Sequence, residues 1–240
     1  MNDTPTSTGV VQSSNEDTQF VFSSGSFPFI DVDSGSVIAS GSILSGVTIV
    51  SLVSTGILRL SGVAVSTGQF IASGSLGNLT YDPLLNGNGT SYTTFTFRVI
   101  DNGGLISAAT YTYQFNITPV NDAPVVLSDT GSIAQSGSGF LAVLTNDTDP
   151  DTGDTKTISG YTLPSNGSII QTATGFTYTA NVVFCGVDTF TYRIADGSGV
   201  LSNTGTVSVT IISCDTTAPL VTLSGAASLT IAQDSAYTDA

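Results

Sequence analysis

Short segments in which every second residue is apolar recur along the whole chain. In the stretch 111–118, Tyr113, Phe115 and Ile117 alternate with polar residues, which is typical of a β-strand with one buried face. The same pattern predicts strands at 19–23, 47–52, 57–60, 79–81 and 94–100, and no segment has a helical period. Glycine-containing turns separate these segments, as at 54–56 and 101–104. The sequence therefore predicts an all-β fold.

The pattern repeats itself at a constant offset of 95 residues. Phe95, Phe97, Asp101 and Pro124 recur as Phe190, Tyr192, Asp196 and Pro219. Residues 187–194 and 205–212 read as the two strands of a hairpin, with Phe190, Tyr192 and Ile194 facing Val207, Val209 and Ile211. Such a regular offset indicates a tandem array, and about 100 residues of short strands per copy indicate antiparallel β-sandwich modules.

Four segments follow from this reading. We expect a flexible leader at 1–15, one sandwich at 16–122, a second at 123–214, and the start of a truncated third repeat at 215–240. The segment 215–240 is too short for a domain of its own, and its strand needs a pairing partner. The beginning of the chain is polar and lacks the basic start of a signal peptide, so we expect any secretion signal to lie outside it.

Composition narrows the classes of partner. Four Lys and Arg residues against 18 Asp and Glu residues give a formal charge of −14, with Glu16 the sole glutamate. This balance argues against nucleic acid and anionic membranes as partners, and no apolar run is long enough to span a bilayer. The absence of histidine removes Ser-His-Asp and Cys-His catalysis. Clustered aspartates favour hard cations, above all Ca²⁺.

The densest group of aspartates lies in the second repeat. Asp147, Asp149, Asp151 and Asp154 share one eight-residue loop, in which carboxylates at alternating positions can converge on a cation. The loop is not an EF-hand, because Thr152 stands where that motif needs glycine. The competing interpretation is a solvated turn, since aspartate favours turns through its own backbone hydrogen bonds.

The motifs together resemble the cadherin-like and Ig-like repeats of giant bacterial surface proteins and adhesins. The resemblance rests on "EDTQFVFSS" at 16–24, "VIDNGG" at 99–104, "VNDAPV" at 120–125, "VLTNDTDPDTGD" at 143–154 and "GVDTFTYRIADGSG" at 186–199. The segment 215–240 resembles the start of another Ig-like repeat. The family implies secreted, calcium-stiffened stalks that carry a binding tip.

The resemblance also implies ligands for calcium at the joint between repeats. The implied set is Asn121, Asp122, Asp147, Asp149, Asp151, Asp154 and Asp196. Less secure positions, which would serve the first module or the next joint, are Glu16, Asp31, Asp33, Asp101 and Asp215.

Cys185 and Cys214 are the only cysteines, and the family usually has none. Folding the chain about the turn at 196–199 brings the two positions close together. A cross-strand disulfide is expected in an oxidising compartment, and the alternative is two unpaired thiols that act as small apolar side chains.

We therefore expect a non-catalytic spacer segment of an extracellular bacterial surface adhesin, whose partners are neighbouring repeats of the same chain. One alternative is an adhesion module that binds a cell-surface glycan or protein through Tyr92, Tyr161 and the turn 86–90. Another is a filament subunit that exchanges residues 217–240 with a second copy. A glycosidase site built from two aspartates and an isopeptide bond to Lys156 are weaker alternatives.

Overall fold

A computed structural model describes residues 3–32 and 43–214, and the chain divides into two compact units. The first unit comprises residues 1–125, 148–156 and 195–201, and the second comprises 126–147, 157–194 and 202–240. The expected third repeat and the exchanged segment 217–240 lie outside the described residues. No helix among the described residues combines the length and apolar character that crossing a membrane requires.

The first unit contains two facing sheets. Its strands are β1 (Val10–Asn15), β2 (Phe20–Val21), β3 (Leu44–Ser51), β4 (Ile57–Leu60), β5 (Val63–Ala64), β6 (Phe70–Ala72), β7 (Leu79–Asp82), β8 (Gly89–Asp101) and β9 (Tyr111–Thr118). They form one sheet in the order β1-β9-β8-β3-β6 and another in the order β2-β7-β4-β5. Two 3₁₀ turns, Ser24–Ser26 and Ser73–Asn78, are the helical elements described here. The all-β prediction is confirmed for this unit.

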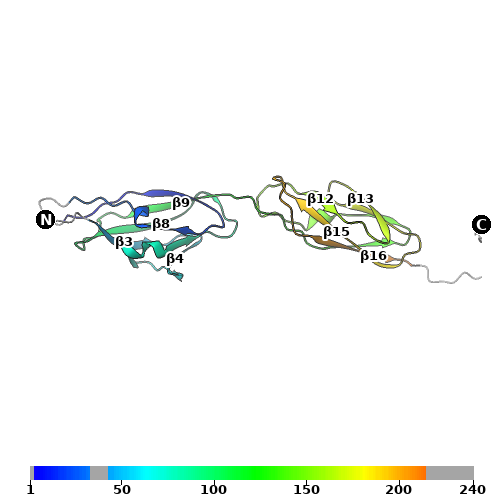
Figure 1. Ribbon diagram of the computed structural model, residues 1–240, viewed down its shortest axis with the longest axis horizontal. Helices are drawn as coiled ribbons and strands as arrows, with labels where there is room; N and C mark the ends of the chain where they lie inside the picture. The colour runs from blue at the N-terminus through cyan, green and yellow to red at the C-terminus, as the bar shows by residue number, and fades with distance from the viewer. Residues whose placement is uncertain (1–2, 33–42, 215–240) are drawn as a thin grey trace, which may run out of the picture. The chain divides into compact units, whose positions relative to one another are not determined.

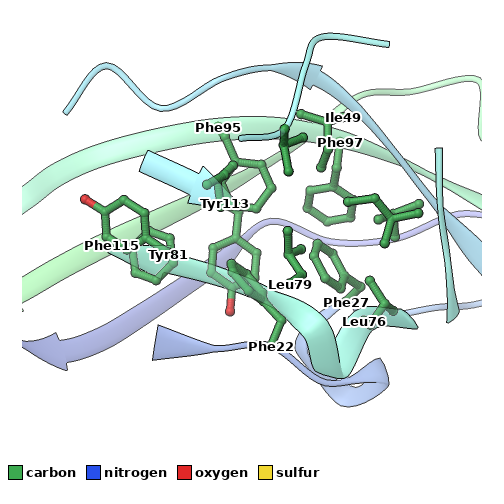
Figure 2. Close-up of a cluster of buried hydrophobic side chains, with 14 of the residues drawn as sticks. Phe22, Phe27, Ile49, Leu76, Leu79, Tyr81, Phe95, Phe97, Tyr113 and Phe115 are labelled. Carbon is green, nitrogen blue, oxygen red and sulfur yellow. The ribbon is translucent and has the colours of Figure 1, made fainter. Parts of the chain in front are cut away.

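Aromatic side chains fill the space between these two sheets. The ring of Phe22 has its centroid 5.3 Å from that of Tyr113 and 5.6 Å from that of Phe27, and all three belong to the cluster in Figure 2. Tyr113, Phe115 and Ile117 are buried, as their alternation predicts. Because protein interiors are close-packed, this cluster fixes the relative position of the two sheets and hence of the turns at their ends.

The N-terminal segment differs from the expected flexible leader. Residues 10–15 form β1, which runs parallel to β9 with Val10 opposite Tyr113 and Asn15 opposite Thr118 (Figure 1). The backbone amide of Glu16 continues this ladder to the Thr118 carbonyl at 3.0 Å. The sequence of β1 is mostly polar after Val10 and Val11 and does not alternate, so the strand could not be predicted, although it pairs with β9 and Val10 packs against the core. This pairing places Glu16 next to the end of the first sandwich.

The second unit repeats this arrangement with fewer strands. They are β10 (Asp129–Ala134), β11 (Ser138–Leu141), β12 (Thr157–Tyr161), β13 (Gly167–Gln171), β14 (Phe176–Ala180), β15 (Gly186–Ala195) and β16 (Gly205–Ile212), with a 3₁₀ turn at Val143–Thr145. Their sheets have the orders β10-β16-β15-β12 and β11-β14-β13 (Figure 1). The predicted hairpin is confirmed, with Phe190 opposite Val207. Here too the first strand, β10, runs parallel to the last, β16.

Candidate functional site: two carboxylate clusters

The turns after β8 and β15 are built in the same way, which gives the 95-residue repeat a structural meaning. The carboxylate Oδ1 of Asp101 accepts the Leu105 amide at 2.8 Å, and Oδ1 of Asp196 accepts the Val200 amide at 2.8 Å. In both turns a glycine three residues after the aspartate has a positive φ, 89° in Gly104 and 87° in Gly199. These aspartates are therefore buried, ordered parts of a turn.

The segment that follows β9 contacts two of the aspartate-rich turns. The Nδ2 group of Asn121 donates to Asp196 Oδ2 at 2.7 Å, and the amide of Asp122 donates to Asp151 Oδ2 at 2.7 Å. An isolated antiparallel bridge between Val125 and Thr148 holds the same segment against the loop 148–156. All of these residues belong to the first unit. The linker carboxylate and the aspartate loop, which the sequence links only by resemblance, are thus adjacent.

One group of carboxylates, the Glu16 cluster, consists of Glu16, Asp122 and Asp151. One carboxylate oxygen from each lies within 4.8 Å of the others. Glu16 is 2% exposed, and its two oxygens accept the Val120 amide at 2.7 Å and the Asn88 amide group at 2.9 Å. Oδ2 of Asp122 is buried and has no hydrogen-bond partner. A buried carboxylate oxygen without a donor is costly, so the cluster is short of positive charge.

A second group, the Asp196 cluster, consists of Asp149, Asp154 and Asp196. Their ligand oxygens also lie within 4.8 Å of one another. Asp149 uses Oδ1 to accept the Asp151 amide at 2.9 Å, whereas its Oδ2 is buried without a partner. Asp154 Oδ1 accepts the Gly197 amide at 2.9 Å, which ties the loop to the turn at 196–199. The two clusters use six of the twelve proposed ligand positions.

The electrostatics of the two clusters differ. Burial, followed by repulsion from Asp17, Asp151, Glu16 and Asp149, raises the pKa of Asp122 above its ordinary value. The hydrogen bond from Asn121 is the main cause that holds the pKa of Asp196 below its ordinary value, against the opposing effect of burial. Asp196 is therefore stabilised as an anion by its neighbours, whereas Asp122 is not.

Asp147 lies apart from both clusters, in the second unit. Its carboxylate accepts the Tyr192 hydroxyl at 3.0 Å and the Leu127 amide at 3.0 Å, and it is 2% exposed. The same hydroxyl contacts Asp129 Oδ2 at 2.8 Å. Of the aspartate-rich loop, Asp151 thus belongs to the Glu16 cluster, Asp149 and Asp154 belong to the Asp196 cluster, and Asp147 lies in a separate buried network.

The remaining acidic positions that were considered for the first module and the next joint do not join either cluster among the described residues. Asp33 and Asp215 lie outside the described residues. Asp31 and Asp101 are described, and neither belongs to one of the two groups of three acidic residues found in the described ranges. A metal in the first module's own loop therefore remains a prediction.

Asp188 is a structurally important carboxylate that the sequence analysis did not single out. It is 3% exposed and accepts hydrogen bonds from the Tyr178 hydroxyl at 2.7 Å and the Asn166 amide at 2.8 Å. The amides of Ser165 and Thr189 add two more. The alternation along β15 could have identified it, because Asp188 lies on the same buried face of the strand as Phe190 and Tyr192.

The two cysteines are joined in the structure. Cys185 and Cys214 form a disulfide with their Cα atoms 6.0 Å apart. Cys185 precedes β15 and Cys214 follows β16, so the bond closes the open end of this hairpin.

Comparison with known proteins identifies one family over part of the chain. Residues 121–213 match the bacterial cadherin-like domain family. Among solved structures, human CDH23 EC21-23 is 16% identical, with a TM-score of 0.47 over 88% of this chain and 70% of that one. Mouse cadherin-23 EC22-24 is 17% identical, with a TM-score of 0.47 over 88% and 67%. At these TM-scores the likenesses support no inference about what this chain binds.

None of the curated proteins matches the chain in sequence. The family match covers the second sandwich together with the linker residues Asn121 and Asp122. Domains of this kind are generally extracellular, non-catalytic modules of adhesion or structure. Over residues 121–213, the chain is therefore similar to the bacterial cadherin-like domain family.

Proposed function

We propose that this chain is a non-catalytic spacer segment of a large extracellular bacterial surface adhesin, stiffened by Ca²⁺ where residue 121 begins the second repeat. The observation that carries the proposal is the pair of buried, unpartnered oxygens, Oδ2 of Asp122 and Oδ2 of Asp149, each inside a carboxylate cluster. Oxygens that are buried without a donor are the places where a cation adds the missing interaction.

The chemistry of the donors fits calcium. Both clusters present carboxylate oxygens, and the side chain of Asn121, whose Nδ2 group donates to Asp196, offers a further amide oxygen. Oxygen donors of this kind suit Ca²⁺, which takes six to eight oxygen ligands in flexible geometry, and do not suit soft transition metals. Glu16, Asp122 and Asp151 would hold one ion, and Asp149, Asp154 and Asp196 would hold another.

Stiffening would follow from which parts of the chain carry these ligands. Glu16 follows β1, Asp122 belongs to the linker, and the other four residues come from the loops 148–156 and 195–201. These segments are far apart in sequence, so an ion bound to several of them would restrict the linker and both loops together. Without the ion, the same carboxylates repel one another.

Calcium is expected to stabilise the metal-stripped protein. At a free Ca²⁺ concentration of 100 times the Kd, linkage gives about 2.7 kcal/mol of stabilisation for one site. We expect binding heat in calorimetric titration and a rise in Tm that Mg²⁺ reproduces only weakly, because Mg²⁺ needs stricter octahedral geometry. Absence of heat together with an unchanged Tm at millimolar Ca²⁺ would rule the proposal out.

Asp122→Asn should change stability in opposite directions with and without calcium. The pKa of folded Asp122 is raised, so its contribution to stability is present at low pH and is lost as pH rises through that pKa. In chelator at neutral pH the neutral amide therefore removes a repulsion, and the variant should melt above the wild type. In saturating Ca²⁺ it should melt below the wild type, because a ligand is missing.

Asp82→Asn is the matched control for this experiment. It removes one negative charge from the same unit but lies outside both clusters, in a partly exposed pair with Arg59 at 3.3 Å. Such pairs contribute roughly 0–1 kcal/mol. The control should retain the full calcium response. If Asp122→Asn lowered the Tm equally in chelator and in Ca²⁺, Asp122 would be a structural residue and not a ligand.

A further inference from the structure

The outer face of each sandwich carries an arginine at the same position of the repeat. Arg98 in β8 and Arg193 in β15 are 95 residues apart, and both are exposed. The Nε group of Arg98 donates to Thr110 Oγ1 at 3.2 Å, and Nε of Arg193 donates to Thr204 Oγ1 at 2.8 Å. Each arginine is thus held in the same way, by the hydroxyl of a threonine that lies just before the next strand.

The surroundings of the two arginines are also repeated. Two residues before each of them a threonine on the same face, Thr96 or Thr191, bonds through its backbone amide to a hydroxyl of another strand or loop. The distances are 3.0 Å to Ser51 Oγ and 2.8 Å to Thr162 Oγ1. The result is a patch of hydroxyl groups beside a guanidinium, built once in each unit.

Each arginine also lines a shallow depression. In the first unit the depression measures about 360 Å³ and includes Thr48, Thr67 and Ile106. In the second it measures about 270 Å³ and includes Tyr161, Thr162 and Thr204. Among the residues that the structure describes, no Asp or Glu lines either depression, although the whole chain has 18 such residues.

Both guanidinium groups retain unused binding capacity. The one ion pair in the described ranges joins Arg59 to Asp82, so Arg98 and Arg193 have no carboxylate partner there. Only their Nε atoms are hydrogen-bonded within these ranges, which leaves the terminal Nη groups available. Guanidinium binds carboxylate and sulfate groups in a bidentate manner through such paired N–H donors.

We propose that each sandwich binds an acidic saccharide at this position, with the arginine recognising a carboxylate or sulfate and the hydroxyls and apolar side chains contacting the sugar. Tyr161, which is 43% exposed, lines the second depression with Arg193, whereas no aromatic residue is among the described residues that line the first. The second site should therefore bind more tightly than the first. This binding does not depend on the calcium clusters, which use other residues.

The charge of −14 does not prevent this binding at physiological salt. The Debye length is about 8 Å at 0.15 M ionic strength, so the distant carboxylates are largely screened while a direct contact with guanidinium is not. An acidic loop of a second copy of the chain could also contact the arginines. The net charge opposes this, because two copies would repel each other.

The test is calorimetric titration of the full chain, in saturating Ca²⁺ and again in chelator, with a tetrasaccharide of galacturonic acid. Its fully methyl-esterified form has the same sugars without charge, and a sulfated tetrasaccharide separates sulfate from carboxylate recognition. We expect two sites and a roughly 10- to 100-fold weaker binding of the ester, the range for a lost charge-assisted hydrogen bond. Either charged sugar would support the proposal.

The variants Arg98→Gln and Arg193→Gln should each remove one of the two sites, and the double variant should remove both. Arg59→Gln is the control, because it removes the same charge from the ion-paired arginine and should leave both sites. All three arginines are at least partly exposed, so equal Tm values would show that folding is intact.

Three results would overturn the proposal. They are no binding of either charged sugar at millimolar concentration, equal binding of the ester, or unchanged binding to the double variant. A fourth result would come from sedimentation analysis. If the wild type self-associated, the double variant did not, and neither charged sugar bound, the arginines would mediate contact between copies of the chain. None of these results bears on the calcium titration, so each proposal can fail alone.

Discussion

Replacing Asp188 by alanine is expected to destabilise the second sandwich by several kcal/mol, because each buried hydrogen-bond donor left without an acceptor costs about 1–3 kcal/mol. The Tyr178 hydroxyl and the amides of Asn166, Ser165 and Thr189 would all lose their acceptor. Hydrogen exchange measured by mass spectrometry should show faster exchange in peptides from β14 and β15. Peptides from β8 and β9, in the other unit, serve as the internal reference.

The pH dependence gives this prediction a second readout. Burial acts to raise the pKa of Asp188, but the hydrogen bonds from Tyr178, Asn166 and Thr189 outweigh it and hold the pKa below its ordinary value. A lowered pKa contributes stability that is present above the unfolded value, about 3.9, and is lost as pH falls through the folded value. Asp188→Ala should therefore flatten the acid limb of the stability profile. A variant with wild-type exchange and an unchanged acid limb would contradict the assignment.

Removal of the disulfide is expected to cost the second sandwich roughly 3–4 kcal/mol. The two cysteines are separated by 29 residues, and closing a loop of this length in the unfolded chain gives a stabilisation of that size in the chain-entropy description. Thermal unfolding of Cys185→Ser/Cys214→Ser should therefore begin at a lower temperature than that of the wild type.

Reduction of the wild type offers a control that changes no residue. A reducing agent should lower the Tm of the wild type to that of the double serine variant and leave the variant unchanged. If reduction left the wild-type Tm as it was, the cysteines would be unpaired thiols in the protein in solution.

Most of the fold could be predicted because the side chains that build the core also alternate along the strands. Phe190, Tyr192 and Ile194 are all buried, as are Val207 and Gly205, which lie opposite Phe190 and Tyr192 on β16. The repeat also identified Asp101 and Asp196, since a turn built from a buried aspartate and a glycine with positive φ depends on short-range sequence. Local patterns of this kind are visible without a structure.

The details of the site depend on contacts that no local pattern contains. In "NDTDPDTGD" several pairs of aspartates have the same spacing, so the sequence alone could not separate Asp147 from Asp149 and Asp151. The difference arises because the Tyr192 hydroxyl and the Leu127 amide take up the carboxylate of Asp147. Glu16 joins its cluster through the pairing of β1 with β9, which the polar sequence of β1 did not indicate.

The parallel pairing of first and last strands has a mechanical consequence. In the first unit the chain enters through β1 and leaves through β9, and in the second it enters through β10 and leaves through β16. Tension applied to the ends of either unit would pull the two paired strands past each other. The force would then act in shear on all the hydrogen bonds between the two six-residue strands at once, instead of breaking them one after another. A chain built in this way resists stretching at the point where the load enters and leaves each unit.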